Sequence, residues 1–203
     1  MDETKFIEEK IKEIKSTIGT EKAISALSGG VDSSACTVLA HRAIGSNLKV
    51  IFIDDGLMRA NEPQDVSQIF ADLGIQVDII DTHEEFFHAL KGKADPEEKR
   101  KAFRDIFYTV FGREVLKSEA KFLVQGTIAA DIIETQGGVK TQHNILEQIG
   151  IDPEKGFGFI AVEPLKELFK PEVRKVAEAL DLPEKIYQRM PFPGPGLAIR
   201  VMG

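Results

Sequence analysis

Apolar residues in this chain occur in two kinds of segment: short uninterrupted runs, and longer stretches in which they recur every three or four positions. Some of the short runs have the length of strands, namely residues 23–27, 49–53, 76–80, 121–125 and 157–162. Uninterrupted apolar runs of this length are typical of parallel strands that are covered on both faces. We therefore expect these five runs to pair in one sheet.

Helical spacing marks the segments between and around these strands. An amphipathic helix is predicted over residues 3–17, where Phe6, Ile7, Ile11 and Ile14 share one face. Further helices are predicted directly after the first strand and over residues 63–73, 96–119 and 171–180. Strands that alternate with helices indicate an α/β fold, an open parallel β-sheet of about five strands with helices on both faces. In such a sheet the ligand lies outside the carboxyl ends of the strands.

Composition narrows the possible classes of function. A chain of 203 residues with 42% hydrophobic content can bury the core of one domain, with or without an appendage. No apolar run reaches the ~20 residues of a membrane span, and the N-terminus lacks the features of a signal peptide, so we expect a cytoplasmic protein with no membrane partner. Its single cysteine, Cys36, excludes an internal disulfide. A net charge of −7 argues against a nucleic-acid polymer as partner.

The first strand runs directly into a segment that is typical of phosphate binding. It consists of Ser28, Gly29, Gly30, Val31, Asp32, Ser33 and Ser34. Two glycines allow a tight turn, and backbone amides at a helix N-terminus attract an anion. The segment lacks the Lys-Ser/Thr pair of a Walker-type loop, so we expect amides, hydroxyls and a metal-binding Asp32 to hold phosphate instead. The alternative is an ordinary strand-to-helix turn in which Ser33 and Ser34 cap the helix.

Polar residues also follow the second and fourth predicted strands. The second strand ends in Ile53, Asp54, Asp55, Gly56 and Leu57. This sequence is compatible with a ligand-facing rim and equally with a capped turn. The fourth strand is followed by Gly126 and then by Asp131 and Glu134, which share one face if their segment is helical. These two acids can share magnesium or orient a nucleophile, and the alternative is a solvated helix start.

Residues 135–157 show no strong periodicity, and this segment carries Lys140 and His143. A loop of about twenty residues in a compact domain is usually a functional lid or a disordered segment. On a lid, Lys140 or His143 can close over phosphate and exclude water. For His143 the alternative is an exposed, non-catalytic position.

Several short motifs occur together in this chain. SGGVDSS at 28–34 is the signature of the N-type ATP pyrophosphatases, which split ATP between its α and β phosphates. With it occur VQGTI at 124–128, VKT at 139–141, EPL at 163–165, FK at 169–170, EVR at 172–174 and PFPGPGLAIRV at 191–201. From about Glu21 to the last residue, this ordered set resembles the ATP pyrophosphatase part of GMP synthetase.

The resemblance implies an adenine nucleotide alpha hydrolase-like fold and a ligase reaction in two steps that uses ATP and Mg²⁺. The 2-oxygen of the purine ring of xanthosine monophosphate attacks the α-phosphorus of ATP and expels pyrophosphate. Ammonia then displaces AMP and gives GMP. In two-subunit forms of the enzyme, which this chain resembles, a separate glutaminase subunit delivers the ammonia.

The resemblance also implies roles for individual residues. Asp32, Lys140 and Asp131 are the expected catalytic residues, and Asp32 is the expected ligand of Mg²⁺. ATP is expected to contact residues 28–34, Ile53, Asp54, Gly56, Leu57 and Gly126. The substrate is expected to contact Glu134, Lys140, His143 and Arg200.

From the helical spacing at the N-terminus and the resemblance after it, we expect the chain to have three parts. Residues 1–20 form the N-terminal helix, residues 21–187 the ATP pyrophosphatase domain with its lid at 135–157, and residues 188–203 a Pro/Gly connector. In the family the connector leads to a dimerisation domain that supplies the subunit contact and part of the xanthosine monophosphate site. We therefore expect a homodimer only if that domain is present.

Two alternative functions stay open. The lid of the family usually reads Lys-Ser-His-His-Asn followed by a glycine pair, and Gln142, Leu146 and Glu147 depart from that pattern. A changed lid is compatible with a changed substrate. The first alternative is therefore another N-type ATP pyrophosphatase, such as NAD synthetase or a tRNA-modifying enzyme. The second is a non-catalytic ATP-binding module derived from the family.

Overall fold

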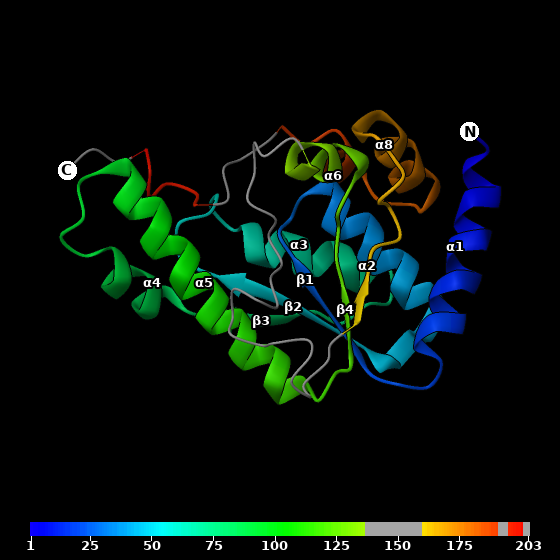
Figure 1. Cartoon of the computed structure of the whole chain (residues 1–203), viewed down its shortest axis with the longest axis horizontal. Helices are drawn as coiled ribbons and strands as arrows, with labels where there is room; N and C mark the ends of the chain where they lie inside the picture. The colour runs from blue at the N-terminus through cyan, green and yellow to red at the C-terminus, as the bar shows by residue number, and fades with distance from the viewer. Residues whose placement is uncertain (137–159, 191–194, 201–203) are drawn as a thin grey trace.

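The computed structural model describes residues 1–136, 160–190 and 195–200, and over these residues the chain forms an α/β fold (Figure 1). The strands in the described part are β1 (Ala23–Leu27), β2 (Leu48–Asp54), β3 (Asp78–Asp81), β4 (Phe122–Val124) and β5 (Ile160–Val162). They form a sheet in the order β3-β2-β1-β4-β5, and each neighbouring pair is parallel. The predicted open parallel sheet is thereby confirmed.

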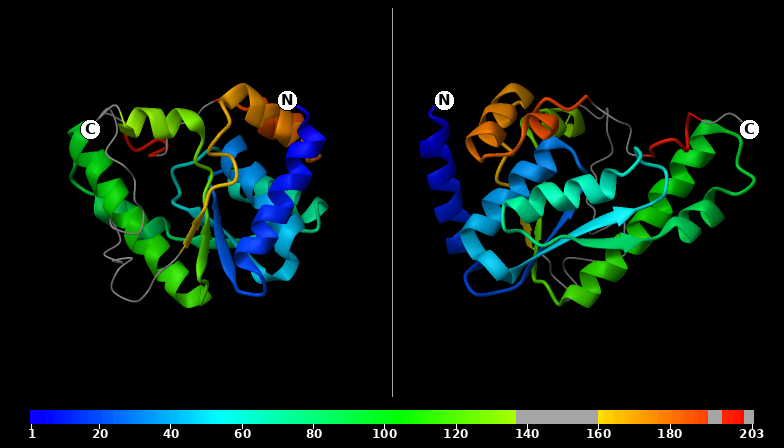
Figure 2. Two further views of the ribbon diagram at one scale, coloured as in Figure 1. Left: turned by 45° about the vertical axis from the view of Figure 1, so that its right-hand side comes forward. Right: turned by 180° about the vertical axis from the view of Figure 1, so that it is seen from behind.

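Helices connect the strands in the order that a parallel sheet requires. They are α1 (Glu3–Ile18), α2 (Val31–Ile44), α3 (Glu62–Asp72), α4 (His83–Leu90), α5 (Pro96–Ser118), α6 (Ala129–Gln136), α8 (Lys170–Ala179) and α9 (Glu184–Tyr187), with a 3₁₀ turn at Gly45–Asn47. Figure 2 shows helices on both faces of the sheet. None of the helices in the described ranges is long and apolar enough to cross a membrane.

Alternation of side chains along the strands divides the core into two clusters. On β2, Val50 and Phe52 pack with α1, α2, α3 and α8, whereas Ile51 and Ile53 pack with α4 and α5. Successive residues of a strand point to opposite faces, so an apolar run such as β2 can fill both clusters. Phe52 and Ile51 are each 0% exposed, which explains why β2 reads as a continuous apolar run.

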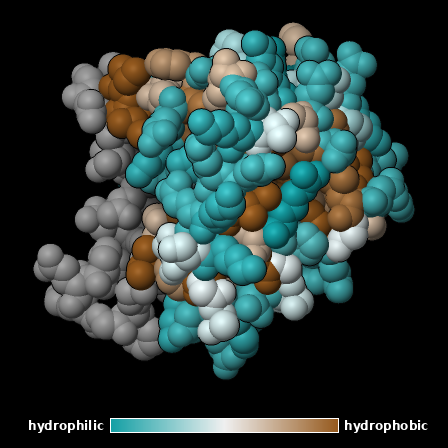
Figure 3. Space-filling model, turned by 90° about the vertical axis from the view of Figure 1, so that its right-hand side faces the viewer, coloured by the Kyte–Doolittle hydropathy of each residue, from teal (hydrophilic) through white to brown (hydrophobic). Residues whose placement is uncertain are grey.

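The N-terminal helix is part of the first of these clusters. Ile7, Ile14 and Ile18 of α1 are buried, and the helix packs against α2 and α8. Asp2 caps the helix by accepting a hydrogen bond from the backbone N–H of Lys5. The molecular face that carries α1 is mainly hydrophilic (Figure 3), as expected for the outer side of an amphipathic helix.

Some elements differ from the sequence-based expectation. The third strand begins at Asp78 rather than at residue 76, and it lies at the sheet edge with Ile79 38% exposed. Helices α4 and α6 have eight residues each, which is too short for a clear helical period, and neither was predicted. Of the fifth predicted strand, residues 160–162 are confirmed, and 157–159 lie outside the described residues.

Candidate functional site

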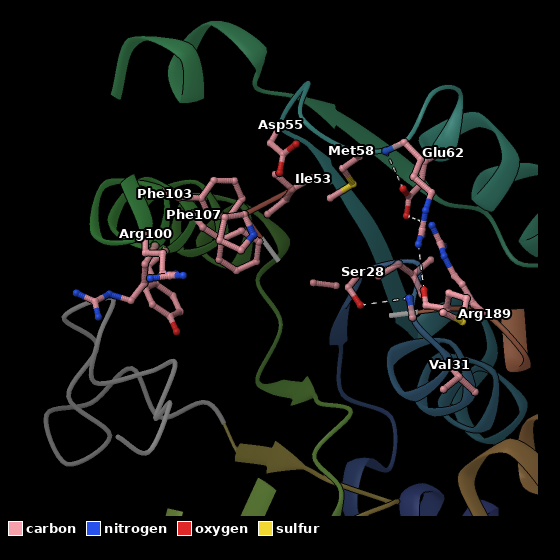
Figure 4. Close-up of a pocket in the computed structure, with 18 of the residues that line it drawn as sticks. Ser28, Val31, Ile53, Asp55, Met58, Glu62, Arg100, Phe103, Phe107 and Arg189 are labelled. Carbon is pink, nitrogen blue, oxygen red and sulfur yellow. Dashed lines mark hydrogen bonds and ion pairs between the residues drawn. The ribbon is translucent and has the colours of Figure 1, made fainter. Parts of the chain in front are cut away.

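A cavity of about 660 Å³ lies at the carboxyl ends of β1 and β2, where a parallel sheet binds its ligand (Figure 4). Four segments contribute most of its lining: the glycine loop after β1, the end of β2, one face of α5 and the first turns of α8. The volume lies within the range of about 300–1,000 Å³ that is usual for small-molecule sites. We treat this cavity as the candidate functional site.

The glycine loop places an uncapped helix N-terminus at the cavity. Gly30 is the N-cap of α2 and provides no side chain to bond the first amides of the helix. Ser33 does not act as that cap, because its Oγ donates to the carbonyl of Gly30 and lies 3.0 Å from Oγ of Ser28. Ser34 is fully buried, and its Oγ has no hydrogen-bond partner in the described structure. The expectation that Ser33 and Ser34 cap the helix is therefore wrong, and the first amides of α2 stay available to an anion.

The first turn of α2 carries a carboxylate with one free oxygen. Nζ of Lys170, at the start of α8, lies 2.5 Å from Oδ2 of Asp32. The other oxygen, Oδ1 of Asp32, is buried and has no hydrogen-bond partner in the described part of the chain. No cluster of three or more potential metal-ligating side chains occurs among the described residues. Because Mg²⁺ is usually held by one or two carboxylates together with phosphate oxygens and water, Oδ1 of Asp32 fits this ion.

Gly126, which follows β4, packs directly beneath the glycine loop. A Cβ atom at this position would lie 2.9 Å from both the carbonyl carbon of Asp32 and the backbone nitrogen of Ser33. The neighbouring Gln125 carbonyl accepts a hydrogen bond from the Cys36 thiol at 3.2 Å. Gly126 is not among the residues that line the described cavity, so its structural role is to let β4 approach the first turn of α2.

The end of β2 supplies a buried carboxyl group to the cavity wall. Ile53 and Asp55 both line the cavity, and Asp55 is only 2% exposed. Its Oδ1 accepts a hydrogen bond from the backbone N–H of Leu57 at 2.8 Å. Burial raises the pKa of Asp55 to about 6, although the Leu57 hydrogen bond acts in the opposite direction.

The neighbouring Asp54 is not part of the described lining, and its contacts stabilise the turn. Its Oδ1 accepts from the backbone N–H of Gly56 at 3.1 Å and lies 2.9 Å from Nε2 of His83. The hydrogen bond to Asp54 raises the pKa of His83. Gly56 has φ of +74°, and a Cβ there would lie 2.9 Å from the ring of Phe87. Asp54 and Gly56 thus shape this rim without lining the described cavity.

One face of α5 forms the wall opposite the glycine loop. It contributes Arg100, Phe103, Arg104, Phe107 and Tyr108, whose spacing of three or four residues places them on one side of the helix. Figure 4 shows Arg100, Phe103 and Phe107 across the cavity from Ser28. This face therefore combines two cations with aromatic rings, a combination suited to an anionic ligand that carries a planar group.

The structure does not bring all predicted site residues to the cavity. Asp131 lies at the start of α6, where its Oδ2 accepts a hydrogen bond from the backbone N–H of Ile128. Glu134 on α6 and the exposed Arg200 do not line the cavity as it is described, and neither does Asp131. Lys140 and His143, with most of the predicted lid, lie outside the described residues.

Conversely, several residues that line the cavity were not among the predicted site residues. The charged ones outside the predicted rim at residues 53–57 are Arg59, Glu62, Arg100, Arg104, Lys170, Arg174 and Arg189. Lys170 and Arg174 lie four residues apart at the start of α8, and both belong to motifs that carried the family resemblance. Two cations spaced four residues apart at the start of a helix beside the sheet edge are a sequence signal that could have predicted both residues.

Comparison with known sequences identifies close relatives. The family model described as NAD synthase matches residues 2–194. The chain is 52% identical to the B subunit of the glutamine-hydrolyzing GMP synthase of Archaeoglobus fulgidus, over 100% of this chain and 65% of that protein. It is 53% identical to the protein of the same name from Pyrococcus furiosus, over 98% of this chain and 62% of that protein. The chain thus spans less than two thirds of the length of these relatives.

Comparison with solved structures supports the fold. The NH3-dependent NAD synthetase of Campylobacter jejuni has a TM-score of 0.71 at 18% identity, over 93% of this chain and 78% of that one. The NMN synthetase of Francisella tularensis has a TM-score of 0.72 at 18% identity, over 97% of this chain and 78% of that one. These similarities show that the described sheet and helices follow the architecture of those enzymes.

Proposed function

Since the chain belongs to the NAD synthase family and is about half identical to the B subunits of GMP synthases, we propose that it is the ATP pyrophosphatase component of a glutamine-hydrolysing GMP synthase. In this reaction xanthosine monophosphate, ATP and ammonia give GMP, AMP and pyrophosphate. The observation that carries the proposal is the uncapped N-terminus of α2 beside the Asp32–Lys170 pair, at the carboxyl end of β1.

The triphosphate of ATP lies, in this proposal, on the glycine loop. Negative charge increases on the pyrophosphate as the bond between the α- and β-phosphates breaks. Several groups that can stabilise this charge lie at this end of the cavity. They are the backbone amides of the first turn of α2, the hydroxyl of Ser28 and the cations of Lys170 and Arg174. Groups that are held in place before the reaction stabilise such charge without reorganisation. Lys140, outside the described residues, is proposed to add a further cation from the lid.

Asp32 is the proposed ligand of Mg²⁺. Lys170 holds one oxygen of this carboxylate and leaves Oδ1 unpaired. A bound Mg²⁺ would neutralise part of the phosphate charge and orient the phosphates for the transfer. Lys170 keeps the carboxylate oriented by its direct contact, and it places a second positive charge at the same end of the cavity.

The adenosine is proposed to lie on the rim formed by the end of β2. Ile53 and Met58 give this part of the cavity an apolar surface, and Asp55 adds a polar group. Leu57, Asp54 and Gly56 shape the rim. An apolar surface with few fixed polar groups is the usual setting for a planar ligand group.

The face of α5 opposite the glycine loop is the proposed site of xanthosine monophosphate. Its phosphate would be bound by Arg100 and Arg104, and its purine would lie against Phe103 and Phe107. Guanidinium groups bind phosphate oxygens through paired hydrogen bonds. In this proposal the purine would lie between the aromatic wall and the α-phosphate of ATP.

The remaining roles are proposals for the larger assembly. Asp131, Glu134, His143 and Arg200 are proposed to face the nucleotide and the reacting purine from parts of the chain beside the cavity. Ammonia is proposed to come from a separate glutaminase subunit, since the relatives are named as one subunit of a glutamine-hydrolysing enzyme. A homodimer is proposed for the form that includes the dimerisation domain.

The direct test is product formation with ammonium in place of the glutaminase subunit. ATP, Mg²⁺, ammonium and xanthosine monophosphate are incubated with the chain, and with a version extended past Gly203. Separation of the nucleotides should show GMP and AMP in equal amounts in the extended version. ATP binding without formation of GMP in either version would favour the non-catalytic module.

A further inference from the structure

A buried ion pair joins three distant segments beside the glycine loop. The guanidinium of Arg189, which follows α9, pairs through Nη2 with Oε1 of Glu62 at the start of α3. The other terminal nitrogen of Arg189, Nη1, donates a hydrogen bond of 2.6 Å to the carbonyl oxygen of Gly29. The side chains of Glu62 and Arg189 are 5% and 18% exposed, so this contact is largely removed from water. Figure 4 shows Arg189 between Glu62 and the strand-loop segment at Ser28.

Both oxygens of the Glu62 carboxylate are used in this arrangement. Oε2 accepts a hydrogen bond of 3.1 Å from the backbone N–H of Arg59. Nη2 of Arg59 donates in turn to the carbonyl of Met190 at 3.0 Å, which ties the segment after Arg189 to the same turn. Because a buried carboxylate is costly unless it is paired and hydrogen-bonded, Glu62 is held in one position by these contacts.

The same pair packs against the backbone of Gly29 and leaves no room for a side chain there. This residue has φ of +70°, a conformation that favours glycine, and a Cβ there would lie 2.6 Å from Nη1 of Arg189 and 2.7 Å from Oε1 of Glu62. The carbonyl of Gly29 and the N–H of Gly30 belong to one planar peptide unit. Fixing the carbonyl on Arg189 therefore fixes the direction of the Gly30 N–H, which lies 3.4 Å from Oγ of Ser28 at the cavity.

We infer that Glu62 and Arg189 are positioning residues: their ion pair orients the Gly29–Gly30 peptide so that the glycine loop can bind the phosphates of ATP. The inference rests on the proposed function, since it assigns phosphate binding to that loop. Neither residue needs to touch the nucleotide. Arg189 acts through its hydrogen bond to Gly29, and Glu62 acts by holding Arg189.

Because Glu62 is charged, one substitution can distinguish a positioning role from a purely electrostatic effect on ATP binding. A carboxylate beside a triphosphate site repels the ligand, so removing its charge would tighten ATP binding if electrostatics alone mattered. If Glu62 positions the loop, the same change weakens ATP binding, because displacement of a binding group by even about 1 Å has a large effect. The two accounts predict opposite signs for one substitution.

The experiment compares Glu62→Gln, Arg189→Lys and the double variant in equilibrium titrations with ATP and with adenosine, at a temperature where thermal unfolding shows each variant to be folded. We expect each single variant to bind ATP at least roughly tenfold more weakly, with adenosine affinity unchanged. The double variant should be no more than about threefold weaker than either single variant, because both substitutions break the same contact. Glu62→Asp replaces Glu62→Gln if the latter does not fold.

The matched control is Glu85→Gln, which removes the carboxylate of the Glu85–Arg113 pair between α4 and α5, away from the cavity lining. It should leave ATP affinity unchanged. Unchanged or tighter ATP binding by folded Glu62→Gln would overturn the positioning role and leave the proposed function in place. Equal weakening of ATP and adenosine would also overturn it, because that result indicates a general defect. Failure of the unsubstituted chain to bind ATP would overturn both.

Discussion

Lys170 and Asp32 form an ion pair of 2.5 Å between residues that are 138 positions apart in the sequence. The pair joins the first turn of α8 to the first turn of α2, directly beside the glycine loop. Lys170 lines the cavity at the end where we place the phosphates, and it contacts Asp32, a carboxylate with one unpaired oxygen that is not itself part of the described lining.

Replacing Lys170 with Met should lower the rate of pyrophosphate release from ATP by roughly 10²-fold, because the leaving group loses a positioned cation. The rate is measured with a coupled assay for pyrophosphate. Lys175→Met is the matched control, since Lys175 lies on the same helix but is exposed to solvent. A similar rate for both variants would show that Lys170 has no role in the reaction.

Gly126→Ala should destabilise the protein and weaken ATP binding together. Its Cβ would lie 2.9 Å from the backbone of Asp32 and Ser33, so either β4 or the first turn of α2 must move. Such overpacking costs about 1–3 kcal/mol, which a denaturant titration measures. Gly74→Ala is the control. Its backbone strain, from a φ of +75°, lowers stability in another way, but its Cβ would meet no atom within 4 Å. We expect the control to lower stability without changing ATP affinity, and equal ATP affinity in both variants would contradict the packing argument.

Asp55→Asn should make the protein more stable at pH 8 and leave its stability unchanged near pH 4. Burial raises the pKa of Asp55 from its ordinary value of 3.8 to about 6, with Asp54 and Glu62 raising it further and His83 lowering it. A raised carboxyl pKa contributes stability below pH 3.8 that is lost as the pH rises through about 6. The asparagine avoids that loss, and its gain at pH 8 is at most about 3 kcal/mol.

Denaturant titrations of both proteins across this pH range measure the difference. The pKa of His83 is itself raised by Asp54, so His83 titrates close to the same pH range. The measurement is therefore repeated with His83→Gln in both proteins, which separates the titration of His83 from that of Asp55. A stability difference between Asp55→Asn and the unsubstituted chain that does not vary between pH 4 and pH 8 would refute the assignment of the raised pKa to Asp55.

Arg100→Ala and Arg104→Ala should each raise the KM for xanthosine monophosphate about tenfold or more and leave the KM for ATP within about twofold, since charge-assisted hydrogen bonds are lost to only one substrate. Steady-state rates with each substrate varied in turn give both constants. Lys101→Ala removes an exposed cation from the same helix outside the cavity lining and should change neither constant. Equal increases in both KM values would show that these arginines do not bind xanthosine monophosphate specifically.

The sheet and the glycine loop could be predicted because their signals are local. Five apolar runs correspond to the strands of the described sheet, and the glycines and hydroxyls of residues 28–34 follow the first of them directly. The short helices α4 and α6 carry too few turns for a period to be visible. The edge position of β3 depends on pairing that sequence periodicity does not reveal.

The electrostatics of the site could not be predicted, because they depend on contacts between distant segments. Asp54 and Asp55 are adjacent in sequence, but only Asp55 is buried against the cavity. Glu62 pairs with Arg189 across 127 positions. The resemblance implied an ATP contact for Gly126, whereas the atoms that a Cβ at this position would meet belong to Asp32 and Ser33 in the first turn of α2. A motif identifies which residue types are present, and the fold decides which of them face the ligand.

The central claim is that the glycine loop binds ATP for transfer of AMP to xanthosine monophosphate. Its most direct test is the rate of pyrophosphate release from ATP, measured with and without xanthosine monophosphate, in the chain of residues 1–203 and in a version extended past Gly203. We predict that xanthosine monophosphate stimulates release in the extended version and that Lys170→Met abolishes most of the stimulation. Release that does not respond to xanthosine monophosphate in either version would contradict the claim.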